Sequence, residues 1–319
     1  MAAFNKRETE EISVEGKTFT YIKDRLLGGR VYFSRDTSEY LRTANAAIIA
    51  GEAKLTRDLY ARGFPVPEVV ATGISDNGTA YYVEKAIGER HFGEIFIEET
   101  KTQGRVSEES FEAFLHVIKR YCRAQFNPSN FVRHDKDALA GITALDNVIR
   151  NNPPSPEMRA MFEEAYKRAS ERILSLPWGY VQADLNPFNI LHDGLIDFEY
   201  AGFGPVGYDV LTNVYFGRMW PKDHIAYVIT DDQIAKYAAE IDEVALEMDA
   251  PNMTSFTNEF LVLKAIWSSH KPKAAEDNPE SYADFWEWRV RMRDWCIRQY
   301  LKGEEIDSNQ FDSVAIDPQ

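Results

Sequence analysis

The sequence is poor in cysteine and in long apolar runs. Its two cysteines, Cys122 and Cys296, lie far apart in 319 residues without a nearby cluster of metal ligands, so neither a disulfide framework nor a zinc site is indicated. No stretch approaches the roughly 18 consecutive apolar residues of a membrane helix, and the start MAAFNKRETEE lacks the basic-then-apolar order of a secretory signal. We therefore expect a cytoplasmic protein with buried free thiols and no association with a membrane.

Basic residues are also scarce relative to acidic ones. Lys and Arg number 36 against 51 Asp and Glu, which gives a formal net charge of -15. Nonspecific binding to nucleic acid depends on Lys and Arg that neutralise phosphates, so the charge argues against a nucleic-acid partner. The charge favours a cationic or neutral partner instead. Residues 303–319 hold five acidic residues and no base, and the rest of the chain remains acidic without them.

A chain of 319 residues is long for one core, and the pattern predicts two lobes. Residues 17–43 mix β-branched and aromatic residues with two turn signals, which predicts three short antiparallel strands. A helix is expected over 44–62, followed by a strand, a DNG turn and a second strand. We expect an N-terminal nucleotide-binding lobe over residues 1–85 with an antiparallel sheet and one helix.

The remainder is expected to be mainly helical, which makes the whole chain an α+β protein. Residues 108–126 and 156–176 have amphipathic helical periodicity, and residues 208–302 indicate helices rich in aromatic side chains. An island of short apolar runs and polar turns interrupts them near residues 178–210. The predicted second lobe covers residues 86–302 and is followed by a loosely ordered acidic tail at 303–319.

Three oxygen-bearing side chains gather in this island. Asp184 is followed five residues later by Asn189, and Asp197 comes after a short apolar pair. Mg²⁺ prefers carboxylate, amide and phosphate oxygens, so Asn189 and Asp197 suit it when nucleotide phosphates complete its ligands. Asp184 could then accept the proton of a substrate hydroxyl. Each pair alone is a common chance occurrence, but their order and close spacing favour a phosphoryl-transfer site.

The stretches QADLNPFNIL and LIDFEYAGFGPVGYDV resemble the HxDxxxxN loop and the IDFE-type metal motif of the aminoglycoside phosphotransferase and choline kinase superfamily. This resemblance implies a two-lobed protein-kinase-like fold and an ATP- and Mg²⁺-dependent transfer of phosphate to a small-molecule hydroxyl. It also implies that Asp184 is the catalytic base, that Asn189 and Asp197 hold Mg²⁺, and that the carboxylate of Asp209 braces the catalytic loop.

The first lobe carries further parts of the resemblance. GEAKLTRDLYARGFPVPEV is similar to the family helix that opens with Glu and runs into a PVPxV strand. Glu52 would then pair with a strand cation that touches the nucleotide phosphates, and we assign Arg42 to that position in place of the usual Lys. Arg42 keeps the charge but is not a neutral replacement; a surface strand residue is the alternative. Gly28 and Gly29 would let a loop approach the phosphates, although a plain hairpin turn explains them equally well.

The same alignment places the adenine ring. Residues Glu84 to Ala86 would form the hinge whose backbone pairs with adenine, and Ile196 would lie beneath the ring. Two positions depart from the family pattern, because Gln182 replaces the usual His and Ala183 stands where Gly or Asn is common. The Gln182 amide has both a donor and an acceptor, so it could still hold the loop by hydrogen bonds to nearby backbone.

Three hypotheses of function remain at this point. A small-molecule kinase is favoured by the intact Asp184, Asn189 and Asp197. A catalytically weak or inactive nucleotide-binding regulator is suggested by Gln182 and Arg42, and a protein kinase is opposed by the short segment after Phe198. The C-terminal tryptophans permit a cationic acceptor such as choline or an aminoglycoside, a sugar is a further candidate, and helix packing is the commoner role for such rings.

Overall fold

The computed structural model describes residues 10–25, 28–198, 200–221, 227–271 and 283–316. The chain divides into two units, of which the first comprises residues 1–89 with 193–196 and the second comprises 90–192 with 197–319. No helix within the described ranges is long and apolar enough to cross a membrane.

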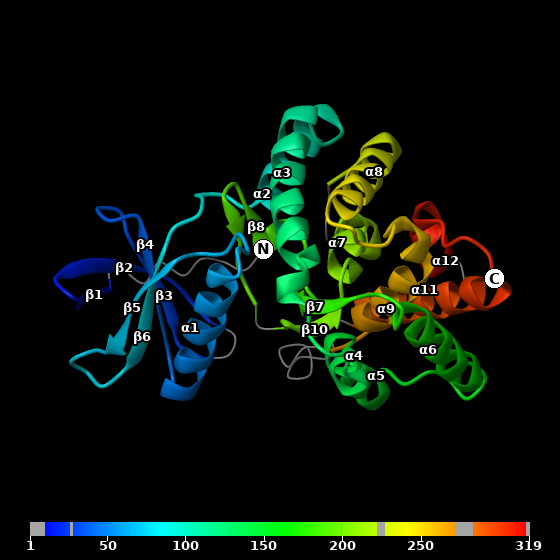
Figure 1. The fold of residues 1–319 in the computed structure, drawn as a ribbon, viewed down its shortest axis with the longest axis horizontal. Helices are drawn as coiled ribbons and strands as arrows, with labels where there is room; N and C mark the ends of the chain where they lie inside the picture. The colour runs from blue at the N-terminus through cyan, green and yellow to red at the C-terminus, as the bar shows by residue number, and fades with distance from the viewer. Residues whose placement is uncertain (1–9, 26–27, 199, 222–226, 272–282, 317–319) are drawn as a thin grey trace. The chain divides into compact units, whose positions relative to one another are not determined.

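The first unit is built on a six-stranded antiparallel sheet with the order β1-β2-β3-β4-β6-β5 (Figure 1). Helix α1 begins after Asn45, whose side chain accepts a hydrogen bond from the Ile48 N–H and so caps the helix. The elements are β1 (Glu11–Val14), β2 (Lys17–Asp24), β3 (Arg30–Ser34), β4 (Glu39–Ala44), α1 (Ala46–Ala61), β5 (Val69–Ile74), β6 (Ala80–Lys85) and β9 (Gly194–Leu195).

Successive side chains of β6 pack alternately into two apolar layers, one on each face of the sheet. Tyr81 and Val83 pack into a cluster with Phe19 and Leu41, whereas Tyr82 packs into a second cluster with Ala80 and residues of α1. Successive side chains of a strand point to opposite faces, so α1 covers only one of the two layers (Figure 1). Both faces of the central strands are therefore buried, which explains their nearly continuous apolar character.

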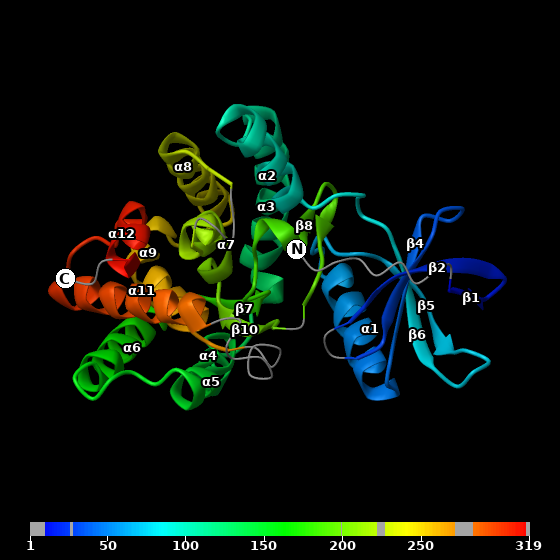
Figure 2. The same cartoon turned by 180° about the vertical axis from the view of Figure 1, so that it is seen from behind.

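The second unit is mainly helical. Helices α3 and α8 pack side by side, and α6, α9 and α11 form another packed group, as Figure 2 shows from behind. Strands β7 and β10 form a small antiparallel sheet. The elements are α2 (Phe92–Gln103), α3 (Glu108–Phe126), η1 (Pro128–Asn130), α4 (Lys136–Ile142), α5 (Leu145–Asn151), α6 (Arg159–Ile173), β7 (Trp178–Val181), η2 (Pro187–Asn189), β8 (Ile190–Leu191), β10 (Gly202–Pro205), α7 (Tyr208–Asn213), η3 (Phe216–Met219), α8 (Asp231–Glu247), η4 (Thr254–Phe256), α9 (Thr257–Ser268), α11 (Ala283–Lys302), η6 (Ser308–Gln310) and α12 (Phe311–Ile316).

The sequence predicted the fold class correctly: an antiparallel sheet with one helix, followed by a mainly helical part, in one α+β chain. The expectation that the acidic tail is loosely ordered is wrong for its described part. Phe311 is completely buried and lies edge-on to the ring of Trp295, and Ile306 is also buried. These apolar contacts with α11 order the segment despite its charge. Residues 317–319 lie outside the described part of the chain.

Candidate functional site

The loop between β7 and β8 carries the first two predicted site residues. Two amide side chains converge on one backbone carbonyl, because Asn186 Nδ2 and Asn189 Nδ2 both donate to the Asp184 oxygen, at 2.8 and 3.0 Å. Asn186 also caps η2 by accepting from the Phe188 N–H. Asn189 Nδ2 lies 3.4 Å from Asp184 Oδ2. The structure thus brings Asp184 and Asn189 side by side in a loop fixed by its own side chains.

Gln182 holds the next part of the site. Its Nε2 donates to the backbone oxygen of Asp197 over 2.6 Å, which ties the segment of Asp197 to the loop of Asp184. Asp197 has a φ of 62° and Ala183 also has a φ of 62°, a left-handed conformation that costs energy in residues with a Cβ. The conformation at Ala183 supplies a physical reason for Gly or Asn at this position. Gln182 therefore makes the backbone hydrogen bond that its amide group led us to expect.

The carboxylate of Asp209 accepts hydrogen bonds that hold the start of the loop between β7 and β8. Its Oδ2 accepts from the Tyr121 hydroxyl and from the Gln182 N–H, both over 2.7 Å, and its Oδ1 accepts from Gln125 Nε2 over 3.1 Å. Asp209 is completely buried, and burial next to this carboxylate raises the pKa of Tyr121 well above its usual value. Tyr121 is therefore a permanent donor, and the network links α3 and α7 to the start of the loop that carries Asp184.

Burial raises the pKa of Asp184 to about 6, and the nearby charge of Asp197 acts in the same direction. The positive charges of Lys264 and Arg289 and the hydrogen bond from Asn186 oppose this rise. The carboxylate is ionised above that pH and is still basic enough to take a proton. A pKa close to the working pH is the property that a general base requires.

The donor atoms present fit a magnesium ion only together with a phosphate ligand. Asn189 uses Nδ2 within the loop, which leaves its amide oxygen for a cation, and the Asp197 carboxylate is exposed. In the described ranges, no group of three His, Cys, Asp or Glu side chains could hold a metal unaided. Mg²⁺ commonly takes one or two protein oxygens and completes its octahedron with phosphate and water, so the residues fit this cation.

The predicted phosphate-contacting residues lie in the first unit, where the cations have carboxylate partners. Arg42 Nε pairs with Glu84 Oε1 over 2.6 Å, and Glu52 pairs with Arg25. Arg42 faces Tyr82 across the β4–β6 ladder, which puts Glu84 two residues further along the same face. Glu52 was expected to pair with the strand cation, and its observed partner comes from the loop after β2 instead.

The two glycines lie in the turn between β2 and β3. Gly28 and Gly29 have φ values of 87° and 91°, and a Cβ on Gly29 would meet the Thr43 carbonyl oxygen at 1.8 Å. Gly29 is therefore required both by its backbone conformation and by its close contact with β4. This accounts for Gly29 as a turn residue, whether or not the loop also approaches a phosphate.

The predicted hinge and ring-binding residues also belong to the first unit. The Ala86 N–H donates to the Ser38 carbonyl over 3.0 Å, so this amide is already hydrogen-bonded in the structure. Glu84 lies at the end of β6 with a buried side chain. Ile196 is partly exposed and follows β9, whose Leu195 N–H donates to the Pro65 oxygen. The assignment of residues 84–86 and Ile196 to adenine binding therefore stays a prediction.

Sequence reasoning missed two cations, Lys264 of α9 and Arg289 of α11. Lys264 Nζ donates to the oxygen of Ala183, the residue before Asp184, over 2.6 Å. A signal existed for Lys264, because it is the one charged residue in the otherwise apolar stretch FLVLKAIW. Charged side chains are almost never fully buried without a reason. The position of Arg289 depends on packing between α9 and α11, which the sequence does not show.

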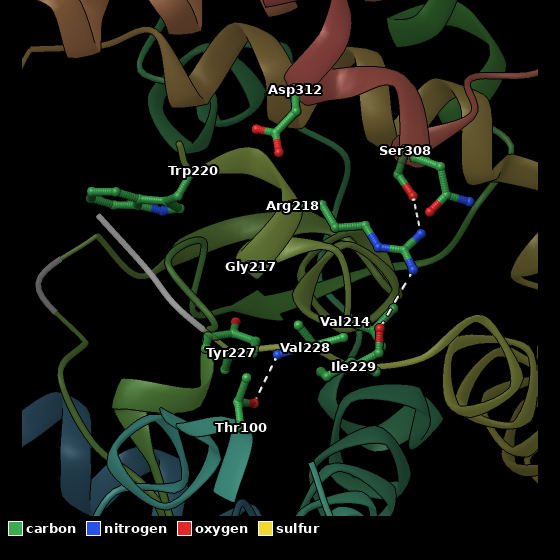
Figure 3. A pocket seen from close by; sticks show the side chains of 11 residues that line it. Thr100, Val214, Gly217, Arg218, Trp220, Tyr227, Val228, Ile229, Ser308 and Asp312 are labelled. Atoms are coloured by element: carbon green, nitrogen blue, oxygen red, sulfur yellow. Dashed lines mark hydrogen bonds between the residues drawn. The ribbon is translucent and has the colours of Figure 1, made fainter. Parts of the chain in front are cut away.

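The C-terminal tryptophans pack mainly as core residues. Trp267, Trp286 and Trp288 are buried, and Trp220 packs against Phe285 in a tilted arrangement with 4.7 Å between the ring centroids. Trp220 also lines a hollow of about 460 Å³, shown in Figure 3. The hollow is lined by Thr100, Val214, Gly217, Arg218, Trp220, Tyr227, Val228, Ile229, Ser308, Asn309 and Asp312. None of the predicted catalytic or metal-binding residues lines it.

The positive charge of Arg218 in this hollow is satisfied within the protein. Arg218 donates to Ser308 Oγ over 2.8 Å and pairs with Asp231 over 2.6 Å, and Figure 3 shows its guanidinium turned toward Ser308. The backbone N–H of Val228 donates to Thr100 Oγ1. These bonds give the polar part of the wall a structural role, so the hollow does not explain the buried cations near Asp184.

Comparison with known proteins places the fold in a class and then in a family. The crystal structure of aminoglycoside phosphotransferase APH(4)-Ia has a TM-score of 0.54 at 14% identity, over 92% of this chain and 93% of that chain. A thermostable mutant of APH(4)-Ia in ternary complex with AMP-PNP and hygromycin B has a TM-score of 0.53 at 15% identity, over 92% and 94%. At such identities the likeness establishes a kinase-like fold and nothing more.

The family follows from the sequence model described as the phosphotransferase enzyme family, which matches residues 27–245. The match covers more than half of the chain, so the protein belongs to this family and is a phosphotransferase of the aminoglycoside phosphotransferase and choline kinase type, as the sequence motifs indicated. A search of the curated proteins found no match.

Proposed function

We propose that this phosphotransferase moves the γ-phosphate of ATP to a hydroxyl group of a small molecule. The observation that carries the proposal is the arrangement around Asp184. Its backbone oxygen accepts hydrogen bonds from Asn186 and Asn189, and its carboxylate has a pKa of about 6. A hydrogen bond from Gln182 to the backbone oxygen of Asp197 connects the segment of Asp197 to the same loop. This arrangement supports the proposal of a base beside two oxygen ligands, as in-line phosphoryl transfer requires.

In the proposed reaction the acceptor oxygen forms a bond to the γ-phosphorus while the bond from that phosphorus to the β,γ-bridging oxygen breaks. The hydroxyl proton moves to a carboxylate oxygen of Asp184, and ADP leaves with the bridging oxygen. Asn189 and Asp197 would hold Mg²⁺, which when bound neutralises phosphate charge. Such transfer depends on positioning and on charge compensation more than on covalent chemistry.

The nucleotide contacts are proposed from residues of the first unit. Arg42 would contact the α- and β-phosphates, with Glu52 as a supporting carboxylate, and Gly28 and Gly29 would bring backbone N–H groups to them. Residues 84–86 would read adenine through their backbone, and Ile196 would pack beneath the ring. The fixed turn at Gly29 and the charge of Arg42 support these assignments.

A nucleotide-binding regulator without catalysis is the second candidate. It is favoured by the pairing of Arg42 with the buried Glu84 and by the hydrogen bond that engages the Ala86 N–H. Both contacts use groups that a catalytic nucleotide complex would need. The retained Asp184, Asn189 and Asp197 favour the enzyme, because an inactive relative has no need of a base and two metal ligands.

The deciding experiment measures acceptor-dependent ADP release from Mg·ATP with wild type and Asp184→Asn. We expect Asp184→Asn to lower kcat by about 10²- to 10⁴-fold, since a positioned general base contributes roughly that factor. The exposed Asp232→Asn serves as the control and should retain wild-type kcat. Tight binding of Mg·ATP without turnover of any acceptor would favour the regulator, and equal kcat in Asp184→Asn and wild type would remove Asp184 from the mechanism.

A further inference from the structure

Two positively charged side chains are buried next to the catalytic loop. Lys264 is 1% exposed and Arg289 is 3% exposed. Each donates one hydrogen bond to a backbone carbonyl oxygen: Lys264 Nζ to that of Ala183 at 2.6 Å, and Arg289 Nη1 to that of Ser268 at 2.6 Å. Taking a charge out of water costs several kcal/mol unless a counter-charge or hydrogen bonds replace the water. Two such groups in one place therefore require an explanation.

No carboxylate of the described ranges forms an ion pair with either cation. Arg289 Nε is buried and has no hydrogen-bond partner there. The neighbours are aromatic faces instead, with Lys264 Nζ 3.6 Å from the Trp267 ring centre and Arg289 Cζ 4.2 Å from that of Trp220. An aromatic face attracts a cation but accepts few of its N–H bonds, so the two groups retain unused capacity for an anion.

Both cations lie within electrostatic reach of the proposed base. Each of them lowers the pKa of Asp184, and the Asp184 charge in turn raises the pKa of each. Burial lowers the pKa of Lys264 to about 8 and that of Arg289 to about 9, so both are mainly protonated at neutral pH. Two positive charges therefore act on the carboxylate that the acceptor hydroxyl must meet.

The same contacts argue against a cationic acceptor. An ammonium group would have to enter beside two buried positive charges, with an unfavourable Coulomb energy in a site of low dielectric. The rings of Trp220 and Trp267, which could have bound a quaternary ammonium, each have a cation of the chain itself over one face. His270 lies beside Trp267, and burial lowers its pKa to about 4, so its imidazole is neutral and cannot act as a counter-charge for a cationic acceptor.

Resting on the proposed function, we propose that Arg289 and Lys264 bind an oxyanion on the acceptor, which makes the acceptor a hydroxylated anion with a carboxylate or phosphate group. The planar guanidinium matches the two oxygens of such a group, and the Lys264 ammonium adds a second charge. The acceptor hydroxyl then faces Asp184 while its anionic group is held on the side of α9 and α11. Aminoglycosides and choline lack this group.

The test separates the acceptor from the nucleotide phosphates as the source of the anion. Wild type is first titrated with Mg·AMP-PNP in a calorimeter, and the saturated protein is then titrated with sodium sulfate. We expect sulfate to bind the saturated protein, and Arg289→Gln to weaken this binding by about tenfold to a hundredfold, the loss expected for one charge-assisted contact. Arg298→Gln, an exposed Arg of the same helix, should bind sulfate as wild type does.

Turnover is then compared in a matched series of glycerol, glycerate, glycerol 3-phosphate and choline. We expect kcat/KM to be highest for glycerate or for glycerol 3-phosphate, and the better of these two anions tells whether the site prefers a carboxylate or a phosphate. Arg289→Gln should reduce the ratio of kcat/KM for that anion to kcat/KM for glycerol. Arg289→Lys keeps the charge, so its ratio should lie between those of wild type and Arg289→Gln. If Arg289→Gln does not fold, Arg289→Lys and the wild-type sulfate titration still decide.

Two results would overturn the inference. If sulfate binds only in the absence of AMP-PNP, the two cations bind the nucleotide phosphates. If choline or glycerol is a better substrate than both anions, the acceptor needs no anionic group. Failure of wild type to bind Mg·AMP-PNP in the first titration would instead reject the proposed function itself. The two failures are therefore distinguishable.

Discussion

The buried cations of the first unit have carboxylate partners, whereas two buried cations near Asp184 in the second unit have none within the described part of the chain. In the first unit Arg42 pairs with Glu84, Arg25 with Glu52 and Lys17 with Glu39. In the second unit the carboxylate of Asp209 is surrounded by neutral donors, while the cations Lys264 and Arg289 lie against aromatic rings and backbone oxygens. Charges that are paired inside the protein contribute to its structure, whereas unpaired charges retain their field for a ligand.

The largest effect that would sharpen this comparison is expected at Asp209. Asp209→Asn replaces a charged acceptor by an amide whose NH₂ group must face the donors from Tyr121, Gln125 or Gln182. We expect the free energy of unfolding of the second unit to fall by about 3 kcal/mol, because a buried donor loses its charged partner. Urea unfolding measures this, with Asp232→Asn expected within about 0.5 kcal/mol of wild type. A loss below about 1 kcal/mol would show that the network is not needed for the fold.

A double-mutant cycle on Arg42 and Glu84 tests the first half of the comparison. Arg42→Met leaves the buried Glu84 carboxylate without its cation and should cost about 2 kcal/mol of stability, and Glu84→Met should cost a similar amount. The double variant should recover most of that loss, because the two effects are coupled. Purely additive costs in urea unfolding would mean that the pair is not structural.

The same variants separate structure from nucleotide binding. If Arg42 contacts phosphate as well, the double variant regains stability but not affinity for Mg·ATP. Calorimetric titration with Mg·AMP-PNP measures that affinity, and Arg57→Met, an exposed Arg of α1, serves as the matched control. Recovery of both properties would limit Arg42 to its structural partner.

The buried His270 predicts a pH dependence confined to the second unit. Burial lowers its folded-state pKa to about 4 from the usual 6.5. As the pH falls below 6.5 the unfolded chain binds a proton that the folded chain does not, so stability is lost toward pH 4. Between pH 7.5 and 5 this loss is about 2 kcal/mol for the wild type. His270→Gln should remove that share of the pH dependence in urea unfolding, whereas the exposed His116→Gln should not.

The smallest effect is expected at Ala183. Its φ of 62° is a left-handed conformation that costs about 1–2 kcal/mol for a residue with a Cβ. Ala183→Gly removes this strain, but it also increases the conformational entropy of the unfolded chain, which offsets part of the gain in folding stability. We expect a net stabilisation of about 0.5 kcal/mol in urea unfolding, with kcat unchanged. A destabilisation above 1 kcal/mol would show that the Ala183 methyl group packs more tightly than the backbone strain suggests.

Local patterns predicted the regular elements well where the chain itself carries the signal. The helix expected over 108–126 is α3 (Glu108–Phe126), because Ser107 caps it and its apolar residues recur at helical spacing. The sequence pattern predicts no helix at the positions of α2 (Phe92–Gln103) or of the two seven-residue helices α4 and α5. Short helices of this kind depend on tertiary packing more than on their own sequence.

In the candidate site, too, the residues close together in the sequence could be predicted, whereas the contacts between distant segments could not. Asp184, Asn189 and Asp197 lie close along the chain, so their proximity could be predicted from spacing within one loop and the turn after it. The partners of Arg42 and Glu52 depend on the register between strands and on the loop after β2, which no local pattern specifies. Lys264 and Arg289 reach the loop through the packing of α9 and α11, 80 or more residues beyond Asp184 in the numbering.

The burial of Phe311 against Trp295 gives the protein a built-in optical reporter. Release of α12 from α11 would expose the Trp295 indole to water and shift its fluorescence to longer wavelength. A version of the chain shortened to residue 303 would show the same shift together with a new apolar surface on α11, and such a surface favours aggregation during expression. Purification tags on this protein are therefore better placed beyond residue 316 than in place of the final helix.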